Sequence, residues 1–248
     1  MLAMPEAAQS PRRKFLLGID TCGPTGSVAL GEWVEGELPG ELRILGETEL
    51  AGRSYSATLV AAVAELLQSA GISVSLLSAI VVVNGPGSFT GVRVGVSAVK
   101  GLAEGSPDLA ILSVSRLEVL AAKAGIASSA LDAHRGEVFL RVGSPAAESR
   151  ELLAGAQELA AIASPPQRLA VCDDSAAALL QAAWPATEQV RVAAPTAADA
   201  LGLCATRIVA GERVDLALLD GHYLRRSDAE IFGEPSGTGL RARVEPRG

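Results

Sequence analysis

A glycine-rich loop is the stretch of this chain whose residue types most suggest chemistry. The sequence from Val81 to Ala103, VVVNGPGSFTGVRVGVSAVKGLA, is an apolar run, a loop with three glycines in seven residues, and then a helical pattern. A strand, a glycine-rich loop and a helix cradle phosphate in many nucleotide-binding proteins, because the helix N-terminus offers free N–H groups. The question is whether residues 85–91 hold a phosphate or only turn the chain.

The loop departs from both common phosphate-binding templates. A Walker A loop has a lysine directly after its last glycine, whereas the first lysine after this loop is Lys100, a helix away. A dinucleotide-binding loop needs a third small residue where this chain has Thr90. The alternative is a tight turn in which Ser88 or Thr90 caps the following helix. We predict no cofactor; the residues that would serve a nucleotide are Asp20, Gly85, Gly87 and Ser88.

Other reactive side chains are few and far apart in the sequence. Three cysteines form no CxxC pair, a pattern typical of small buried residues in a reduced compartment: Cys22, Cys172 and Cys204. The two histidines are His134, in a predicted turn, and His222. Asp20 closes the first apolar run, where an aspartate commonly caps a turn.

Length and charge limit the possible functions. The 248 residues are 49% hydrophobic and 20% charged, a globular composition that allows one large domain or two lobes. The net charge is -7 and no basic face is visible in the sequence, so we do not expect the chain to bind nucleic acid without a partner. No apolar stretch reaches about 18 uncharged residues, which predicts no membrane helix. The N-terminal segment has its basic cluster after its apolar residues, the wrong order for a secretory signal, so we expect a cytoplasmic protein.

Hydrophobic periodicity predicts the elements that position the loop. Strands are expected at 15–19, 27–33, 42–50, 79–84 and 109–114, and helices at 56–70, 91–104 and 116–124. The series then begins again, with strands at 129–132, 137–142, 168–172 and 189–193 and helices at 154–163, 175–183 and 197–210. Asp132 closes the first strand of the second series, as Asp20 closes that of the first. The pattern indicates a duplicated α/β fold with a degenerate second half.

The same pattern predicts the domain organisation. We expect disordered tails at 1–13 and 229–248. The first half is predicted to span 14–112, with the 196–210 helix packing back on it, and the second half 113–195.

The helices at 56–70 and 91–104 carry more apolar surface than one buried face requires. The first has a single charge, Glu65, with leucines on one side and alanines on another. The second contains Gly95 and Gly101, each of which costs about 1 kcal/mol relative to alanine unless something packs closely against the backbone. Since a surface helix normally shows one apolar stripe, either a partner protein covers the second face or both helices are interior.

Five segments together resemble the TsaB family, also called YeaZ. They are GIDTCGPTGSVAL (18–30), GPGSFTGVRVGVSAVKGLA (85–103), SVSRLEVLAA (113–122), LDAHRGEVF (131–139) and YLRR (223–226). The resemblance implies the duplicated, ribonuclease H-like α/β fold of actin, Hsp70 and sugar kinases. It also implies a non-catalytic subunit of the bacterial machinery that makes threonylcarbamoyladenosine beside the anticodon of tRNA. In that machinery TsaD is the catalytic partner, and TsaE is an ATPase that joins the pair.

The resemblance implies roles for individual residues as well. Catalytic paralogues carry H-x-E-G-H, where this chain has Arg116 and Leu120 in place of the two histidines, so we predict no metal site and no catalytic residue. The two apolar helices match the dimerisation surface used for TsaD and for self-pairing, and tRNA is reached only through the complex. The residues expected at that interface are Tyr55, Ala57, Leu59, Val60, Ala61, Ala64, Val94, Gly95 and Ala98. A tyrosine, Tyr55, precedes the first helix where the family has a histidine.

Two other functions of the same fold stay open. One is a glycoprotease-like metallopeptidase, against which the missing histidine pair argues. The other is a small ATP-dependent enzyme that uses the loop at 85–91. Against it, the turn after Asp132 lacks the glycine-rich, phosphate-binding form.

Overall fold

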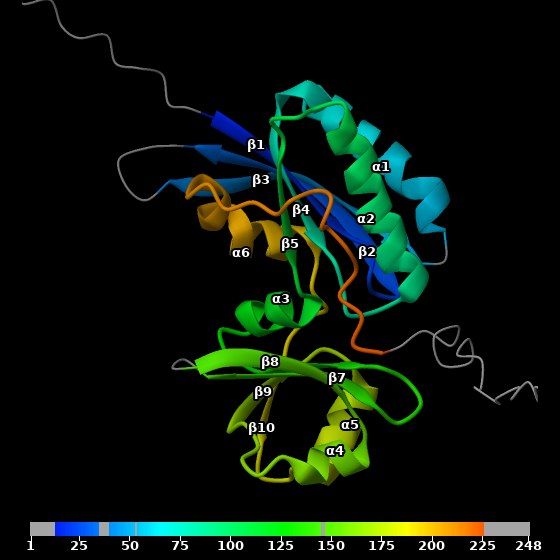
Figure 1. Ribbon diagram of the computed structural model, residues 1–248, viewed down its shortest axis with the longest axis vertical. Helices are drawn as coiled ribbons and strands as arrows, with labels where there is room; N and C mark the ends of the chain where they lie inside the picture. The colour runs from blue at the N-terminus through cyan, green and yellow to red at the C-terminus, as the bar shows by residue number, and fades with distance from the viewer. Residues whose placement is uncertain (1–12, 35–39, 53, 145–146, 226–248) are drawn as a thin grey trace, which may run out of the picture.

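Two five-stranded sheets, each with helices on both faces, make up the molecule (Figure 1). This computed structural model describes residues 13–34, 40–52, 54–144 and 147–225. The predicted disordered tails at 1–13 and 229–248 lie outside the described residues, except that Arg13 already begins the first strand. No helix within these ranges has both the length and the apolar character that crossing a membrane requires.

The first sheet is built from the residues up to 114. Its elements are β1 (Arg13–Asp20), β2 (Thr25–Val34), β3 (Glu41–Ala51), α1 (Tyr55–Ser69), a 3₁₀ turn η1 (Val74–Leu76), β4 (Leu77–Val83), α2 (Phe89–Glu104) and β5 (Ala110–Val114). Every strand and α-helix among them lies within two residues of the bounds predicted from periodicity.

The second sheet follows after a connecting helix. Its elements are α3 (Arg116–Lys123), β6 (Ser129–Asp132), β7 (Val138–Ser144), β8 (Ala147–Ala154), α4 (Ala156–Ala161), β9 (Arg168–Val171), α5 (Asp174–Ala183), β10 (Glu188–Arg191) and α6 (Ala197–Val209). The strand β8 corrects the sequence analysis, which predicted none there. It is an edge strand, and its polar sequence AESRELLA lacks the apolar alternation of an interior strand.

The two sheets have the same strand order, which confirms the predicted duplication. The first runs β3-β2-β1-β4-β5 and the second β8-β7-β6-β9-β10. In each, the first strand pairs antiparallel with the second and parallel with the fourth: β1 with β2 and β4, and β6 with β7 and β9. Both central strands end in an aspartate, Asp20 in β1 and Asp132 in β6, so these carboxylates occupy equivalent positions.

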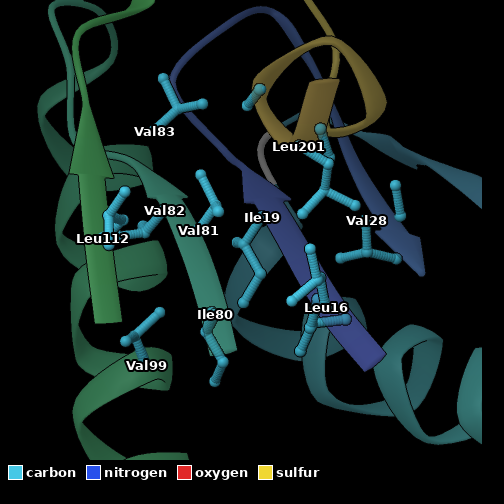
Figure 2. Packing of buried hydrophobic residues seen from close by; sticks show 14 of the residues in the cluster. Leu16, Ile19, Val28, Ile80, Val81, Val82, Val83, Val99, Leu112 and Leu201 are labelled. Carbon is cyan, nitrogen blue, oxygen red and sulfur yellow. The ribbon is translucent and has the colours of Figure 1, made fainter. Parts of the chain in front are cut away.

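The largest core lies on both faces of the first sheet. Successive strand residues point to opposite faces, so Ile19 and Val82 contact α2 near Gly95, whereas the backbone at Gly18 contacts α6. Figure 2 shows Val99 of α2 below Val82 and Leu112 on one side of the strands, and Leu201 of α6 near Val28 on the other side. The chain therefore returns from the second sheet to complete the core of the first.

The two halves meet at a pair of helices. In Figure 1, α3 lies between the sheets with α6 above it, and the two helices pack together. Helix α3 packs on β6, β7 and β9 of the second sheet, and α4 and α5 pack together on the opposite side. After α6, the chain crosses back over the first half, where Val214 N donates to Ile111 O (2.8 Å). The domain limits at 112–113 and 195–196 stay predictions.

Candidate functional site

A buried ion pair links the two halves at the end of β1. The Asp20 carboxylate accepts one hydrogen bond from Cys22 N (2.8 Å) and another from Arg116 Nε (3.2 Å). Arg116 is the first residue of α3, and its backbone N donates to Gly85 O (2.6 Å). The side chains of Asp20 and Arg116 are 1% and 6% exposed. Asp20 thus caps its turn, as predicted, and in addition binds a guanidinium that the sequence analysis did not connect with it.

Burial and the nearby Asp20 charge keep the Cys22 thiol protonated, which is its non-nucleophilic form. Burial alone would lower the pKa of Arg116, but the neighbouring Asp20 carboxylate raises it, so the guanidinium stays charged. Burial, reinforced by the Asp20 charge, raises the pKa of the Cys22 thiol well above its usual range. The same two causes raise the pKa of Tyr55 to about 12. Since the thiolate is the reactive form of cysteine, Cys22 is held as an unreactive thiol.

The glycine-rich loop is packed against the turn that follows β1. Ser88 N donates to Cys22 O (2.8 Å), and a Cβ at Gly87 would collide with the same carbonyl oxygen. Ser88 Oγ accepts from Gly91 N (3.2 Å) and caps α2, which is the turn role predicted for it. These donors at the start of α2 are therefore satisfied within the chain and do not point toward free space.

The three glycines inside α2 have different surroundings. A Cβ at Gly95 would lie 2.6 Å from Thr21 Oγ1, which itself donates to Gly91 O (2.7 Å). Gly91 and Gly95 thus let α2 approach the β1–β2 turn, within the chain. Nothing lies within 4 Å of a Cβ at Gly101, which is on the exposed side of the helix. No contact inside the described residues explains the helix-weakening glycine at 101.

A cleft of about 720 Å³ opens between the two halves. One wall comes from the first half, including Gly87, Ser88 and Val94, and Arg116 lies in it. The other wall comes from the second half, including Asp132 and His134. Of the residues named for a nucleotide, Gly87 and Ser88 line the cleft, whereas Asp20 and Gly85 are not part of its lining.

The second half repeats the turn at Asp20 without its buried partner. Asp132 accepts from His134 N (2.8 Å), two residues on, just as Asp20 accepts from Cys22 N. His134 is an exposed turn residue, 84% accessible at its side chain, whose ring lies 2.9 Å from the Asp132 carboxylate. Asp173 caps α5 through Ala176 N and accepts from Asp132 N. Across the described ranges, no three His, Cys, Asp or Glu side chains are grouped as a metal site requires.

Helices α1 and α2 lie side by side on the outer face of the first sheet (Figure 1). The residues expected at a partner interface divide by exposure. Ala57, Val60, Ala61 and Ala64 of α1 are exposed, and Val60 is 68% accessible. Val94 and Ala98 of α2 are partly exposed. Tyr55, Leu59 and Gly95 point inward; the Tyr55 hydroxyl donates to Gly23 O (2.8 Å). The side chains on the outward face of α1 and α2 are therefore small and apolar. Tyr55, Leu59 and Gly95 lie beneath this face, toward the core.

Sequence reasoning missed a polar node that joins three segments. The Glu151 carboxylate on β8 accepts from Ser115 Oγ (2.7 Å) and Arg141 Nη1 (2.8 Å) and lies 2.9 Å from His222 Nε2. Burial would raise the pKa of Glu151, but hydrogen bonds from His222, Ser115 and Arg141 lower it. Two of the three partners lie 36 and 71 residues away in the sequence, so only the tertiary structure reveals the node.

Comparisons with known proteins find similar sequences and a matching family model. Residues 48–161 match the family model described as "TsaD: tRNA N6-adenosine threonylcarbamoyltransferase". Two similar proteins, from Bacillus subtilis and Escherichia coli, are each described as "tRNA threonylcarbamoyladenosine biosynthesis protein TsaB". They are 38% and 34% identical over 128 and 130 residues, and each match covers 50% of this chain and 52% of the relative. The chain thus spans about half the length of the curated relatives it matches.

Solved structures match over more of the chain. YeaZ from Pseudomonas aeruginosa is 25% identical, with a TM-score of 0.63, over 85% of this chain and 100% of that one. A crystal structure described as an uncharacterized protein with similarity to peptidase YeaZ, also from Pseudomonas aeruginosa, is 27% identical, with a TM-score of 0.66. It covers 86% of this chain and 100% of its own. With the repeated strand order, these matches confirm the predicted duplicated, ribonuclease H-like fold of actin, Hsp70 and sugar kinases.

Proposed function

The chain belongs to the TsaB (YeaZ) family, and we propose that it is a non-catalytic subunit that dimerises with TsaD. In this proposal it activates TsaD for threonylcarbamoyl transfer to the adenosine beside the anticodon of tRNA. The names of its relatives, tRNA threonylcarbamoyladenosine biosynthesis proteins, support the pathway.

The observation that carries the proposal is the outward face of α1 and α2. Ala57, Val60, Ala61 and Ala64 of α1 leave an apolar surface on a helix whose opposite side is already buried in the core. Small side chains allow the backbones of two helices to approach closely, and a protein partner would remove this surface from water. An interface of ordinary size, about 800 Å² on each side, fits two helices of this length.

The ion pair at Asp20 supports the non-catalytic part of the proposal. Active proteins of this fold use an acidic residue here to approach a metal-bound nucleotide, whereas here the Arg116 guanidinium already lies on the Asp20 carboxylate. A cation brought to the same carboxylate would meet a fixed positive charge, so these residues do not fit a metal-nucleotide. A full equivalent of zinc or iron in protein purified without a histidine tag would instead favour a peptidase.

The wider assembly follows from the same proposal. TsaE joins the pair, tRNA is contacted through the complex, and the chain self-pairs through the same helices when TsaD is absent. The net charge of -7 supports indirect tRNA contact, because a protein that binds phosphates on its own needs a basic surface. We propose that the complex works in the cytoplasm.

Ala61→Glu tests the interface. Ala61 is exposed in the free chain, so the new carboxylate can point into water and folding should survive. In a closed interface the same charge would be buried without a partner, and we expect association with TsaD to weaken at least a hundredfold. Light scattering of the mixture, beside a thermal melt, measures both properties.

A matched control is Ala178→Glu, on the exposed side of α5 in the second half. It makes the same chemical change away from α1 and α2 and should leave association unchanged. Wild-type association of the Ala61→Glu protein would contradict the proposed interface.

A further inference from the structure

Three side chains form an exposed cluster where α2 begins. The ring centroids of Phe89 and Tyr223 are 5.0 Å apart, with their planes tilted by 47°. The guanidinium carbon of Arg93 lies 3.8 Å from the centroid of the Phe89 ring. Phe89 and Arg93 are one helical turn apart on α2. Tyr223 belongs to residues 219–225, here called the C-terminal segment. Two parts of the chain that are distant in sequence thus share one surface feature.

The cluster is unusual because aromatic residues are rare in this chain and the others that the structure describes are buried or partly buried. Aromatic residues make up 3% of the sequence. Both tryptophans, Tyr55 and Phe139 are buried, whereas Phe89 and Tyr223 are 37% and 38% exposed. In the described part of the chain they are the two aromatic side chains that count as exposed, and they lie against each other. Exposed rings gathered in one place mark an interaction surface.

The α1–α2 face lacks the residue types that usually contribute most of the binding energy of an interface. Alanine and glycine permit close approach, but they bury little area, and interface energy is concentrated in tyrosine, tryptophan and arginine side chains. On α1, Val60 is the large apolar side chain that ranks as exposed. The ring cluster lies on the same helix as Val94 and Ala98 and supplies the missing types of residue.

The basic side chains exposed on α2 favour a partner with an acidic surface. Arg93 stacks on Phe89, and among the described residues its guanidinium pairs with no carboxylate, so its N–H donors are available. Lys100 is exposed two turns further along α2, before Glu104 ends the helix. The chain as a whole is acidic, so a local basic stripe favours an acidic protein surface. The net charge disfavours a polynucleotide, whose phosphates would meet repulsion elsewhere.

We propose that Phe89, Arg93 and Tyr223 anchor the interface with the protein partner. The interface then extends from α1 and α2 onto the C-terminal segment, and the partner presents a carboxylate to Arg93 and an apolar side chain to the two rings. This inference rests on the proposed function, since the partner is the protein named there.

Two variants, Arg93→Glu and Tyr223→Ala, test the anchor in the full chain mixed with purified TsaD. Truncating an anchor residue or reversing its charge should weaken association about tenfold or more. Arg93 is exposed, so a carboxylate at this position can point into water and the Arg93→Glu protein should keep the wild-type melting temperature. If Tyr223→Ala loosens the C-terminal segment and lowers the melting temperature, Arg93→Glu decides the question alone.

Two control variants, Tyr223→Phe and Leu76→Ser, should leave association unchanged. Tyr223→Phe retains the stacked ring and should bind like wild type. Leu76→Ser removes an exposed apolar side chain, 54% accessible, just before β4, whereas Phe89 lies just past the end of that strand. Leu76 therefore sits at the opposite end of the α1–α2 pair, and its loss should leave association unchanged.

The outcomes separate this inference from the proposed function. Wild-type association of Arg93→Glu and Tyr223→Ala, with loss in Ala61→Glu, overturns the anchor and leaves the subunit role intact. Wild-type association of all three variants contradicts the subunit role itself. Unchanged protein association with weaker tRNA binding by the complex would make the cluster a nucleic-acid contact and also overturn the anchor.

Discussion

At the scale of single residues, the Asp20–Arg116 pair is the most informative contact in the molecule. Both side chains are buried, they belong to different halves, and each supplies the other's counter-charge. Removing charges from water is costly, so such a pair is stable only while both members are present. The pair therefore joins the halves at the end of β1.

Removing one member should cost far more than removing both. In Arg116→Met, Asp20 is left buried without its partner, and we expect a loss of about 3–5 kcal/mol in the free energy of unfolding. In the double variant Asp20→Asn with Arg116→Met no net charge remains, so much of this stability should return. Urea unfolding of the two single variants and the double variant measures the coupling. Simple additivity of the single effects would show that the pair is not coupled.

What the sequence could predict at this scale depends on distance along the chain. The turn caps at Asp20 and Ser88 were predictable because donor and acceptor lie two or three residues apart. The pairing of Asp20 with Arg116 spans 96 residues and depends on how α3 enters the second half. From sequence, Arg116 could only be recognised as a residue that replaces a histidine ligand.

At the scale of elements, α2 shows two separate uses of glycine. Gly95 allows the helix to pack on Thr21, whereas Gly101 meets nothing within 4 Å in the described residues. The sequence analysis gave both the same explanation, close packing against the backbone. Only the three-dimensional contacts separate a glycine required inside the chain from one that is free on the outer surface.

The two glycines should respond in opposite ways to alanine. In Gly95→Ala the new Cβ would lie 2.6 Å from the buried, hydrogen-bonded Thr21 hydroxyl, so we expect the melting temperature to fall. In Gly101→Ala the methyl group enters open space, and the gain in helix propensity should stabilise the isolated chain by about 0.5–1 kcal/mol. Thermal melts of the two proteins test this directly. A stabilised Gly95→Ala protein would contradict the close packing of α2 on the turn.

Element prediction succeeded wherever one face of an element is apolar. All six α-helices predicted from periodicity are present in the described ranges, as are nine of the ten strands. The missed strand, β8, lies at a sheet edge with charged residues such as Glu151, so no apolar alternation marks it. Its pairing with β7 provides the ordering that its own sequence does not.

At the scale of the whole molecule, the C-terminal segment holds the two halves together. His222 N donates to Asn84 O (2.7 Å) in the first half, while the His222 ring lies 2.9 Å from Glu151 in the second. Arg225 adds an ion pair with Glu137. The segment therefore presents Tyr223 beside α2 from a position fixed at both ends, which makes the ring cluster a property of the assembled molecule.

The duplicated fold supports the proposal that this molecule binds a partner and is not itself catalytic. The repeated sheet order preserves the aspartates at the ends of β1 and β6, but Arg116 neutralises one and His134 faces the other in an exposed turn. The outer surface of α1 and α2 stays available for a partner. The duplication was predictable from the repeated pattern of elements. The position of Arg116 in the cleft lining was not, because it depends on both halves being in place.

The most direct test of the central claim measures threonylcarbamoyladenosine formed on tRNA. TsaD, TsaE, threonylcarbamoyl-adenylate and tRNA are combined with the wild-type chain, with the Ala61→Glu protein, or with no added subunit. We predict modified adenosine only with the wild-type chain, background product in the other two mixtures, and none when this chain is given the substrates without TsaD. Full product without the added subunit, or product from this chain alone, would contradict its role as a non-catalytic activator.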